Sequence, residues 1–324
     1  MTIGLADRIL QNDVSTFVAA LDQAAFHEEL ERLCVSEWRC GAPRDVHVEP
    51  VRAHRNRCTL EIALTTVSGP RRLIGKVYAD DRLDAFRAMR AVRRAGFGPD
   101  SAFSIARPLA WLPVLGVRLE EKVEGPSVKD IILTGGSAEW TAAAERCGTW
   151  LARFHCLAPT PQTGSDLLAA LAHSREAVTR MTGLRPKAEA LLRRLEEAAA
   201  LASPVPRRAG HGSYIPEHVI LSGASTVVID LDDYDAADPA RDVAWFLVAL
   251  QRRAIQLLGS RHVLTGAADA FIRAYATAGP QGALANLQLY RALMCLRHAR
   301  RDLDKQTPEL AEFMIDEALR LMSH

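Results

Sequence analysis

The feature that most constrains the fold is a change of hydrophobic period along the chain. Between residues 46 and 79 the sequence alternates polar and apolar residues, with many β-branched side chains, in runs separated by turn-forming stretches such as "SGP". Alternation with a period of two is typical of half-buried β-strands. The runs read "VHVEPVRAH", "RCTLEIALTTV" and "RRLIGKVYA". We therefore predict three antiparallel strands in this part of the chain.

Elsewhere, apolar residues recur every three or four positions, which is typical of amphipathic helices. Helices are predicted over 14–34 and in "DDRLDAFRAMRAVRRAGFG", which opens with acids and stops at glycine; two short strands are expected in "ARPLAWLPVLGVRLEEKVEG". A strand pair is expected at 211–230. The remaining segments are predicted to be helical: 137–157, 165–202, 240–260, 264–278 and 284–302. This order predicts an α+β fold, with a small N-terminal antiparallel sheet carrying one helix and a larger, mainly helical C-terminal part.

Charge and cysteine content narrow the range of partners. The 324 residues include 40 Lys and Arg against 39 Asp and Glu, a net charge of +1. A nearly neutral chain has no overall attraction for polyanions, so we expect a small-molecule substrate or ligand, with no nucleic acid and no membrane; the oligomeric state stays open. The six cysteines contain no CxxC pair, and the N-terminus lacks a basic start followed by an apolar stretch. Free, buried thiols and a cytoplasmic location are expected.

Residues 211–230 concentrate side chains that can carry chemistry. "HGSYIPEH" contains His211, Gly212, Ser213 and His218, and the apolar run that follows ends in "VVID" at Asp230. Two more acids follow within the same turn, in "DLDDY". Because a hard cation prefers clustered oxygen ligands, this turn is a candidate metal site.

This arrangement resembles the aminoglycoside phosphotransferases and their protein-kinase-like relatives, in which HGDxxxxN is followed about a dozen residues later by an apolar strand ending in Ile-Asp. "DPARD" at 238–242 and "LARFH" at 151–155 match two further segments of that family. The resemblance covers roughly residues 48–300. It implies a two-lobed protein-kinase-like fold. The predicted parts are an N-terminal helix and nucleotide-binding lobe at 1–122, and a helical C-terminal lobe at 123–324 with a catalytic-type loop at 211–221 and a metal-type loop at 229–242.

The resemblance also implies roles for single residues. Lys76, on the third strand, matches the lysine that binds nucleotide phosphates, and Glu121 and Val123 lie where the connection between lobes contacts the nucleotide. Asp230 matches the principal metal-binding aspartate, and His218 replaces the asparagine of the second metal contact. The implied cofactors are ATP and Mg²⁺. Mn²⁺ is an alternative because imidazole is a poor ligand for magnesium.

Ser213 stands where the family has the aspartate that accepts the substrate proton. A serine hydroxyl cannot act as a general base near neutral pH, and loss of such a base costs about 10²–10⁴ in rate. Phosphoryl transfer depends mainly on alignment and charge, so slow transfer could survive, or Glu217 or Asp232 could take the proton. His211 matches a position that orients the metal-binding loop. The catalytic candidates are Ser213, His211 and Asp232.

Other positions also depart from the family pattern. The helix after Lys76 contains no glutamate to pair with it, and Asp84, near its start, is the only acid in the body of that helix. The loop between the first two strands, "RAHRNRC", contains no glycine, so backbone cradling of phosphates is less favoured. Its arginines could supply charge instead; they are Arg52, Arg55 and Arg57.

Three functional classes fit these residues. The first is ATP-dependent phosphoryl transfer to a small-molecule hydroxyl from a rearranged site. The second is a catalytically inactive pseudokinase that binds a nucleotide or another ligand. The third is different chemistry on the same fold, because a fold does not fix a function. Lys76, Asp230 and Asp232 favour the first, whereas the missing base and the glycine-free loop favour the others.

Overall fold

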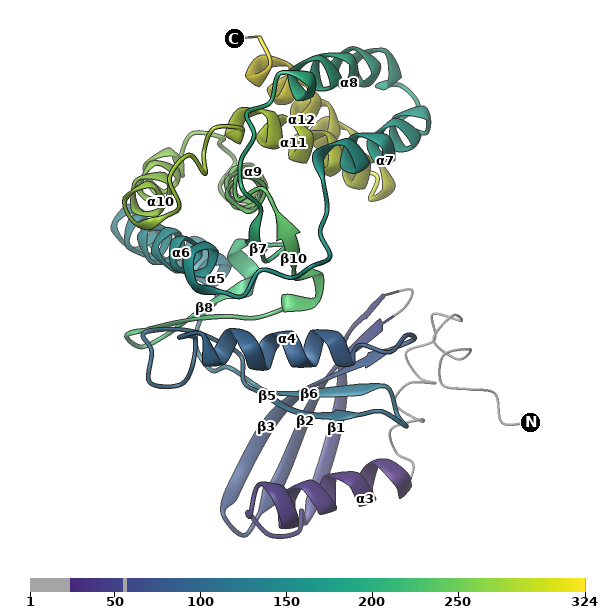
Figure 1. Cartoon of the computed structure of the whole chain (residues 1–324), viewed down its shortest axis with the longest axis vertical. Coiled ribbons are helices and arrows are strands. Elements are labelled where there is room, and N and C mark those ends of the chain that lie inside the picture. The colour runs from purple at the N-terminus through teal and green to yellow at the C-terminus, as the bar shows by residue number, and fades with distance from the viewer. Residues whose placement is uncertain (1–23, 55–56, 324) are drawn as a thin grey trace, which may run out of the picture. The chain divides into compact units, whose positions relative to one another are not determined.

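The computed structural model describes residues 24–54 and 57–323, which form two compact units (Figure 1). The first unit contains the described residues up to Gly98 together with Ser104–Glu124. The second contains Pro99–Phe103 and the chain from Gly125 onward. Each unit is described by itself below. Arg55 and the first ten residues of the predicted helix 14–34 lie outside the described part of the chain.

The first unit is built on a five-stranded antiparallel sheet, as the alternating pattern predicts. The strand order is β1-β2-β3-β6-β5, and β2 alternates between more and less buried residues along almost its whole length. This burial pattern is the physical basis of the sequence alternation. The strands are β1 (Asp45–His54), β2 (Arg57–Thr66), β3 (Gly69–Tyr78), β5 (Pro108–Leu112) and β6 (Val117–Glu121).

Two helices accompany this sheet. α3 (Ala24–Arg32) continues into a π-helical turn, Leu33–Glu37, and its apolar residues share one buried cluster with β2 and neighbouring strands. The described part of the predicted helix 14–34 is thus helical and extends three residues further. α4 (Leu83–Arg94) ends just before Gly96, whose positive φ of 108° suits glycine at a helix end.

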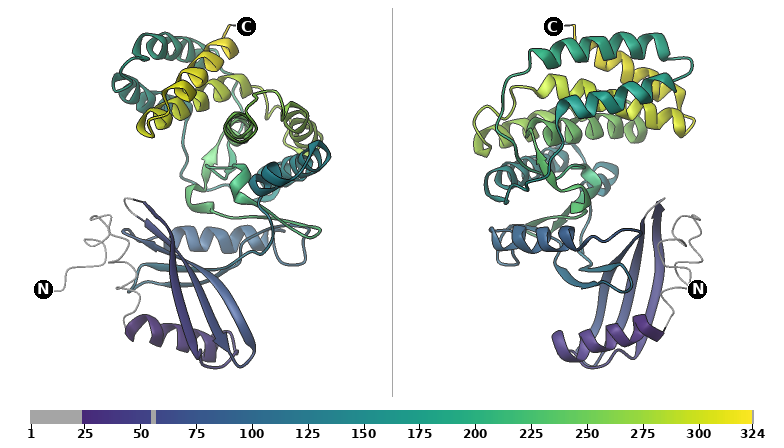
Figure 2. Two further views of the ribbon diagram at one scale, coloured as in Figure 1. Left: turned by 180° about the vertical axis from the view of Figure 1, so that it is seen from behind. Right: turned by 45° about the vertical axis from the view of Figure 1, so that its right-hand side comes forward.

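The second unit contains most of the helices, and Figure 2 shows them from two further sides. The predicted segment 165–202 is divided near Gly183, where φ is +84°. The helices are α5 (Val128–Thr134), α6 (Ser137–Leu157), α7 (Leu167–Thr179), α8 (Arg185–Ala200), α9 (Ala240–Leu258), α10 (Thr265–Ala278), α11 (Leu287–Asp304) and α12 (Pro308–Leu321). α5 and α12 were not predicted. No described helix has both the length and the apolar character needed to cross a membrane.

Short strands and turns interrupt the helices of the second unit. The predicted strand pair is the β8–β9 hairpin, whereas the pairing of β7 with β10 was not predicted. β4 (Phe103–Ile105) begins at the last residue of the Pro99–Phe103 segment. The other elements are β7 (Arg208–Gly210), the 3₁₀ turn η2 (Pro216–His218), β8 (Val219–Ser222), β9 (Ser225–Val228), η3 (Leu231–Asp233) and β10 (Asp235–Ala237).

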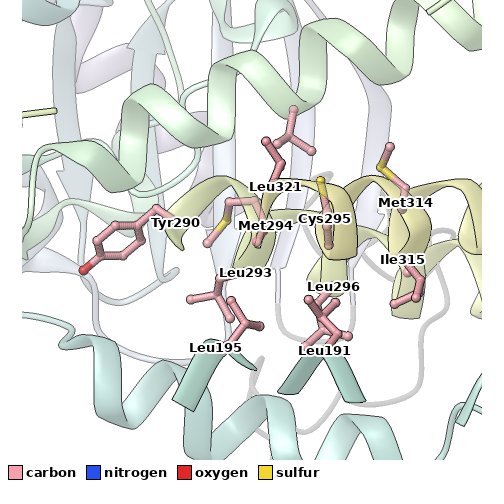
Figure 3. Packing of buried hydrophobic residues seen from close by; sticks show 14 of the residues in the cluster. Leu191, Leu195, Tyr290, Leu293, Met294, Cys295, Leu296, Met314, Ile315 and Leu321 are labelled. Carbon is pink, nitrogen blue, oxygen red and sulfur yellow. The ribbon is translucent and has the colours of Figure 1, made fainter. Parts of the chain in front are cut away.

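A large apolar cluster joins α7, α8, α9, α11 and α12. Figure 3 shows Leu191 and Leu195 of α8 facing Leu293 and Leu296 of α11. These leucines are at most 2% exposed, so truncating one to alanine should cost about 2–5 kcal/mol of unfolding free energy. The cluster gives α9 and α11 a rigid setting on which functional side chains can be placed.

All six cysteines are free, as predicted, and five of them are buried. Cys156, near the C-terminal end of α6, is exposed, so the expectation of six buried thiols is wrong at this position. The helical period places Cys156 on the outer side of α6, while Cys147 of the same helix is completely buried.

Candidate active site

Asp242, in the first turn of α9, braces the start of the "HGSYIPEH" loop. Its Oδ2 accepts a hydrogen bond from the His211 backbone N–H at 2.6 Å, and its Oδ1 accepts one from the Gly212 N–H at 3.1 Å. Gly212 has φ +81°, and a Cβ atom there would come within 2.3 Å of the Asp233 carbonyl oxygen. Only glycine therefore suits this position without movement of the turn that follows Asp230.

Asp242 is 1% exposed, and neighbouring positively charged or polar side chains stabilise its carboxylate. Burial alone would raise its pKa, but Arg241, His155 and His211 together lower it far below its usual value. His155, the last residue of "LARFH", lies 3.3 Å from Asp242 Oδ2 through Nε2, and its Nδ1 lies 2.8 Å from the Tyr275 hydroxyl. The two family segments "LARFH" and "DPARD" therefore meet in one buried ionic network.

His211 connects this network to the metal-type loop. Its side chain is fully buried, and burial lowers its pKa although Asp242 and Asp230 oppose the shift, so the ring is neutral. Its Nε2 lies 3.1 Å from the Ile229 carbonyl oxygen and donates to it. Within the described residues, Nδ1 makes no hydrogen bond. His211 thus contacts the backbone immediately before Asp230, and the orienting role that the family resemblance implies stays a prediction.

Asp230 has a left-handed backbone conformation, with φ +66° and ψ +54°. Its Oδ2 lies 3.3 Å from His218 Nε2, and His218 Nδ1 lies 2.9 Å from the Ser213 carbonyl oxygen. One ring nitrogen of His218 thus faces the Asp230 carboxylate and the other faces a backbone carbonyl. The second unit therefore brings Ser213, His218 and Asp230 together.

Neither side chain that was considered as a replacement base next to Ser213 stands free of the protein. Ser213 Oγ forms no hydrogen bond with any other described residue, so the hydroxyl itself is available but is not activated. The Glu217 carboxylate is buried and forms an ion pair with Arg253 of α9, which stabilises its charged form and engages it. Asp232, in η3, is 5% exposed. Of the two acids, Glu217 is the poorer proton acceptor, and Asp232 stays the predicted one.

The acids after the apolar run do not form a ready metal cluster. Across residues 24–54 and 57–323, no three His, Cys, Asp or Glu side chains lie close enough together to hold a metal ion. The predicted gathering of Asp230 with Asp232 and Asp233 is therefore wrong as a preformed site. Asp230 alone still fits a metal that arrives with a nucleotide, because Mg²⁺ in such sites takes one or two carboxylates and completes its shell with phosphates and water.

The first unit places Lys76 on β3, where its side chain is 6% exposed. Lys76 lies opposite Arg118 of β6, and Ile74 lies opposite Glu120, so Lys76, Arg118 and Glu120 project from the same face of the sheet. Arg118 and Glu120 form a buried ion pair at 2.7 Å. Asp84 is largely exposed and lies 3.7 Å from Arg82. Glu120 is thus a buried carboxylate near Lys76 that the sequence interpretation missed.

The other predicted nucleotide contacts also lie in the first unit. Glu121 ends β6, its side chain is exposed, and its backbone N–H donates to the Arg107 carbonyl at 2.9 Å, so this N–H is not free for a ligand. Val123 is half-buried just before the unit boundary. Arg52 is exposed and Arg57 half-buried. Their contacts with a nucleotide, and the proximity of Lys76 to Asp230, stay predictions.

A family model described as "Phosphotransferase enzyme family" matches residues 64–314. This match covers most of the sequence. The chain belongs to the phosphotransferase enzyme family. No curated protein compared with the chain matches it in sequence.

Several solved structures share the fold. Crystal structures with this architecture include the aminoglycoside phosphotransferase APH(4)-Ia, with a TM-score of 0.64 and 14% identity over 95% of this chain and 98% of that one. A choline/ethanolamine kinase family protein from Mesorhizobium loti has a TM-score of 0.62 and 15% identity over 92% and 95% of the two chains. Spectinomycin phosphotransferase APH(9)-Ia, crystallised with ADP and spectinomycin, has a TM-score of 0.61 and 12% identity over 91% and 97%. The predicted α+β, two-lobed kinase-like fold is confirmed.

Proposed function

We propose that this phosphotransferase-family protein transfers a phosphoryl group from ATP to a hydroxyl of a small molecule, using a rearranged site without the usual aspartate base. The observation that carries the proposal is the left-handed backbone of Asp230, one of three non-glycine residues with positive φ in the described part of the chain. Such conformations cost about 1–3 kcal/mol and cluster at functional sites. The buried network of Asp242, His211 and the Ile229 carbonyl supports the same conformation.

Each candidate site residue of the second unit has a proposed role in this reaction. Asp230 would hold the metal that accompanies the nucleotide, and that metal would neutralise phosphate charge. His218, whose Nε2 lies 3.3 Å from Asp230 Oδ2, would take the place of the amide ligand. Ser213 would hydrogen-bond the acceptor hydroxyl, and Asp232 would accept its proton. His211 and Asp242 would keep the loop in position.

The proposed nucleotide contacts come from the first unit. Lys76 would bind the phosphates, with Glu120 of the same sheet face keeping it charged in place of the absent helix glutamate. The Glu121 carbonyl and Val123 would contact the base. APH(9)-Ia and a mutant of APH(4)-Ia, which share the fold of this chain, were both crystallised with ADP. These complexes support the proposal that this chain also binds an adenine nucleotide.

Thermal unfolding with ATP tests the proposal. Because a ligand that binds only the native state raises the melting temperature, ATP with Mg²⁺ or Mn²⁺ should stabilise the wild-type protein. Asp230→Asn, which tolerates the same backbone conformation, should fold but lose the metal-dependent part of the shift. Asp269→Asn, in α10, is the matched control and should keep the whole shift. An unchanged melting temperature for wild type at millimolar nucleotide would contradict the proposal.

The alternative function is that of a pseudokinase, and the His218–Asp230 contact favours it. His218 Nε2 lies 3.3 Å from Asp230 Oδ2, and a protonated ring at this distance would compete with a metal ion for the same oxygen. His218→Asn separates the two functions. For a phosphotransferase the substitution should increase metal-dependent ATP hydrolysis, whereas for a pseudokinase it should leave hydrolysis at background and alter only ligand binding.

A further inference from the structure

Two arginines of α11 lie against Trp245 of α9. The guanidinium carbon of Arg297 lies 4.9 Å from the Trp245 ring centroid, and that of Arg301 lies 5.5 Å away. Two cations over one aromatic ring repel each other, while stacking holds each guanidinium in a defined plane. Trp245 is 5% exposed, so this platform is anchored in the packed body of the unit.

Arg297 lacks a nearby counter-ion. Among the described residues, no carboxylate lies within 4.0 Å of its guanidinium, and its side chain is half-buried. Burial, followed by the charges of Arg301 and Arg241, lowers the pKa of Arg297 to about 10. The fold therefore keeps a positive charge at a position that disfavours it, although a neutral residue would remove the cost.

His298, the next residue of α11, is a second unsatisfied polar group in the same cluster. Its side chain is 7% exposed and packs edge-on against Trp245, with ring centroids 6.0 Å apart. Its Nε2 forms no hydrogen bond with any described residue. Burial first, and then nearby arginines, lowers the pKa of His298 well below its usual value; these arginines are Arg252, Arg301, Arg297 and Arg253.

The cluster adjoins both motif loops of the second unit. Arg253 pairs with Glu217, which lies in the "HGSYIPEH" loop between Ser213 and His218. Arg297 also feels the charge of Asp233, three residues after Asp230. Arg252 pairs with Asp302, so the acids around the cluster serve arginines other than Arg297. One arginine near the cluster thus contacts the loop that carries Ser213, and Arg297 lies within electrostatic range of the turn that follows Asp230.

We propose that Arg297, with Arg301, Trp245 and His298, forms a subsite for an oxyanion of the acceptor substrate, so that the substrate is a polyhydroxylated carboxylate or phosphate ester. This inference rests on the proposed function and names its substrate class. A planar guanidinium held on an aromatic ring presents paired N–H donors that match the two oxygens of a carboxylate or phosphate. A cationic amine would meet the same charges with repulsion, so an aminoglycoside-like or choline-like acceptor does not suit this subsite.

Calorimetric binding without nucleotide tests the inference, using four sugars that differ mainly in charge. Gluconate carries a carboxylate, glucose 6-phosphate a phosphate ester, glucose no charge and glucosamine a positive charge. The wild-type protein should bind gluconate or glucose 6-phosphate at least tenfold more tightly than glucose, and should not bind glucosamine. The stronger of the two anions identifies the acid. Equal binding of glucose, or binding of glucosamine, would overturn the proposal.

Variants locate the site. Arg297→Gln should weaken binding of the anion at least tenfold, since a hydrogen bond to a charged group contributes about 1.5–3 kcal/mol. Arg297→Lys keeps the charge without the planar fork and should give an intermediate loss. Arg185→Gln removes one exposed charge from α8 and should leave binding unchanged. An equal loss in Arg185→Gln and Arg297→Gln would mean that net charge alone attracts the anion.

Stability measurements guard this test against unfolding. Arg297→Gln relieves like-charge repulsion and should not lower the melting temperature, and Arg297→Lys, which keeps the charge and an apolar stem, should stay close to the wild type. The assay contains no nucleotide. If ATP does not raise the melting temperature but anion binding depends on Arg297, the phosphotransferase function is contradicted and the subsite is not. If ATP raises the melting temperature but no anion binds, only the subsite is contradicted.

Discussion

The two ends of the "HGSYIPEH" loop differ in their hydrogen-bonding partners and in how closely their residues match the family motif. At the bracing end, His211 and Gly212 donate backbone N–H groups to Asp242, and the neutral His211 ring donates to Ile229. At the reacting end, Ser213 replaces a carboxylate and His218 lies between a carbonyl and Asp230. The two histidine rings are stacked with centroids 5.9 Å apart, yet the His211 ring is fully buried and neutral, whereas His218 Nε2 lies 3.3 Å from Asp230 Oδ2. The buried supports of the loop are therefore in place, whereas Ser213 and His218, to which reactant contacts are assigned as a proposal, differ from the family motif.

The largest expected effect comes from the bracing end. Asp242→Ala would leave two backbone N–H donors and His155 without their acceptor and would remove one of the two carboxylates beside the buried Arg241, which keeps its pair with Asp235. Loss of one partner of a buried ion pair costs about 3–5 kcal/mol. We expect the midpoint of urea unfolding to fall accordingly. Asp233→Ala, an exposed acid in the neighbouring turn, is the control and should change the unfolding free energy by less than about 0.5 kcal/mol. Similar losses in both variants would show that Asp242 does not brace the loop.

A smaller loss is expected for Gly212→Ala. The left-handed backbone costs a non-glycine residue about 1–2 kcal/mol, and the added Cβ would also meet the Asp233 carbonyl at 2.3 Å. Gly223→Ala, in the β8–β9 turn, has φ +57° but open space around its Cβ position. The difference between the two variants in urea unfolding isolates the steric contact. Equal costs would show that the turn after Asp230 can move away from the loop.

How far the sequence predicts this molecule depends on the range of the interactions. Local period predicts the β1–β2–β3 sheet, and motif spacing predicts that Ser213, His218 and Asp230 come together. Pairings between distant segments, such as Glu217 with Arg253, leave no periodic signal. Glu120 was missed because a glutamate in "VRLEE" has the pattern of an exposed strand residue, whereas its burial depends on pairing with Arg118. The break near Gly183 was missed because the apolar period continues on both sides of it.

The pH dependence of stability should report His211. Because burial lowers its pKa in the folded state, the unfolded chain binds a proton first as pH falls, so stability is present above the unfolded pKa of about 6.5 and is lost below it. The loss is at most about 1.4 kcal/mol per pH unit for one such group. His211→Gln should reduce the slope of unfolding free energy between pH 6.5 and 5.5, even though the variant is less stable overall. His173→Gln, on the exposed side of α7, is the matched control, and an equal change of slope there would contradict the assignment.

Ser213→Asp tests the reacting end with the smallest change in free energy. If the protein is a slow phosphotransferase that lacks its base, the new carboxylate should raise turnover about tenfold, which corresponds to about 1.4 kcal/mol, out of the 10²–10⁴ that a positioned base supplies. ATP hydrolysis is a sufficient assay, and turnover should rise with pH through the titration of the new carboxylate. If the site serves binding alone, the same substitution places a second negative charge near Asp230 and should weaken an anionic ligand. Ser213→Asn, which adds similar volume without a base, separates the two effects. A gain in hydrolysis with aspartate but not with asparagine requires the lost-base interpretation, whereas no gain in either variant, with intact folding and nucleotide binding, contradicts it.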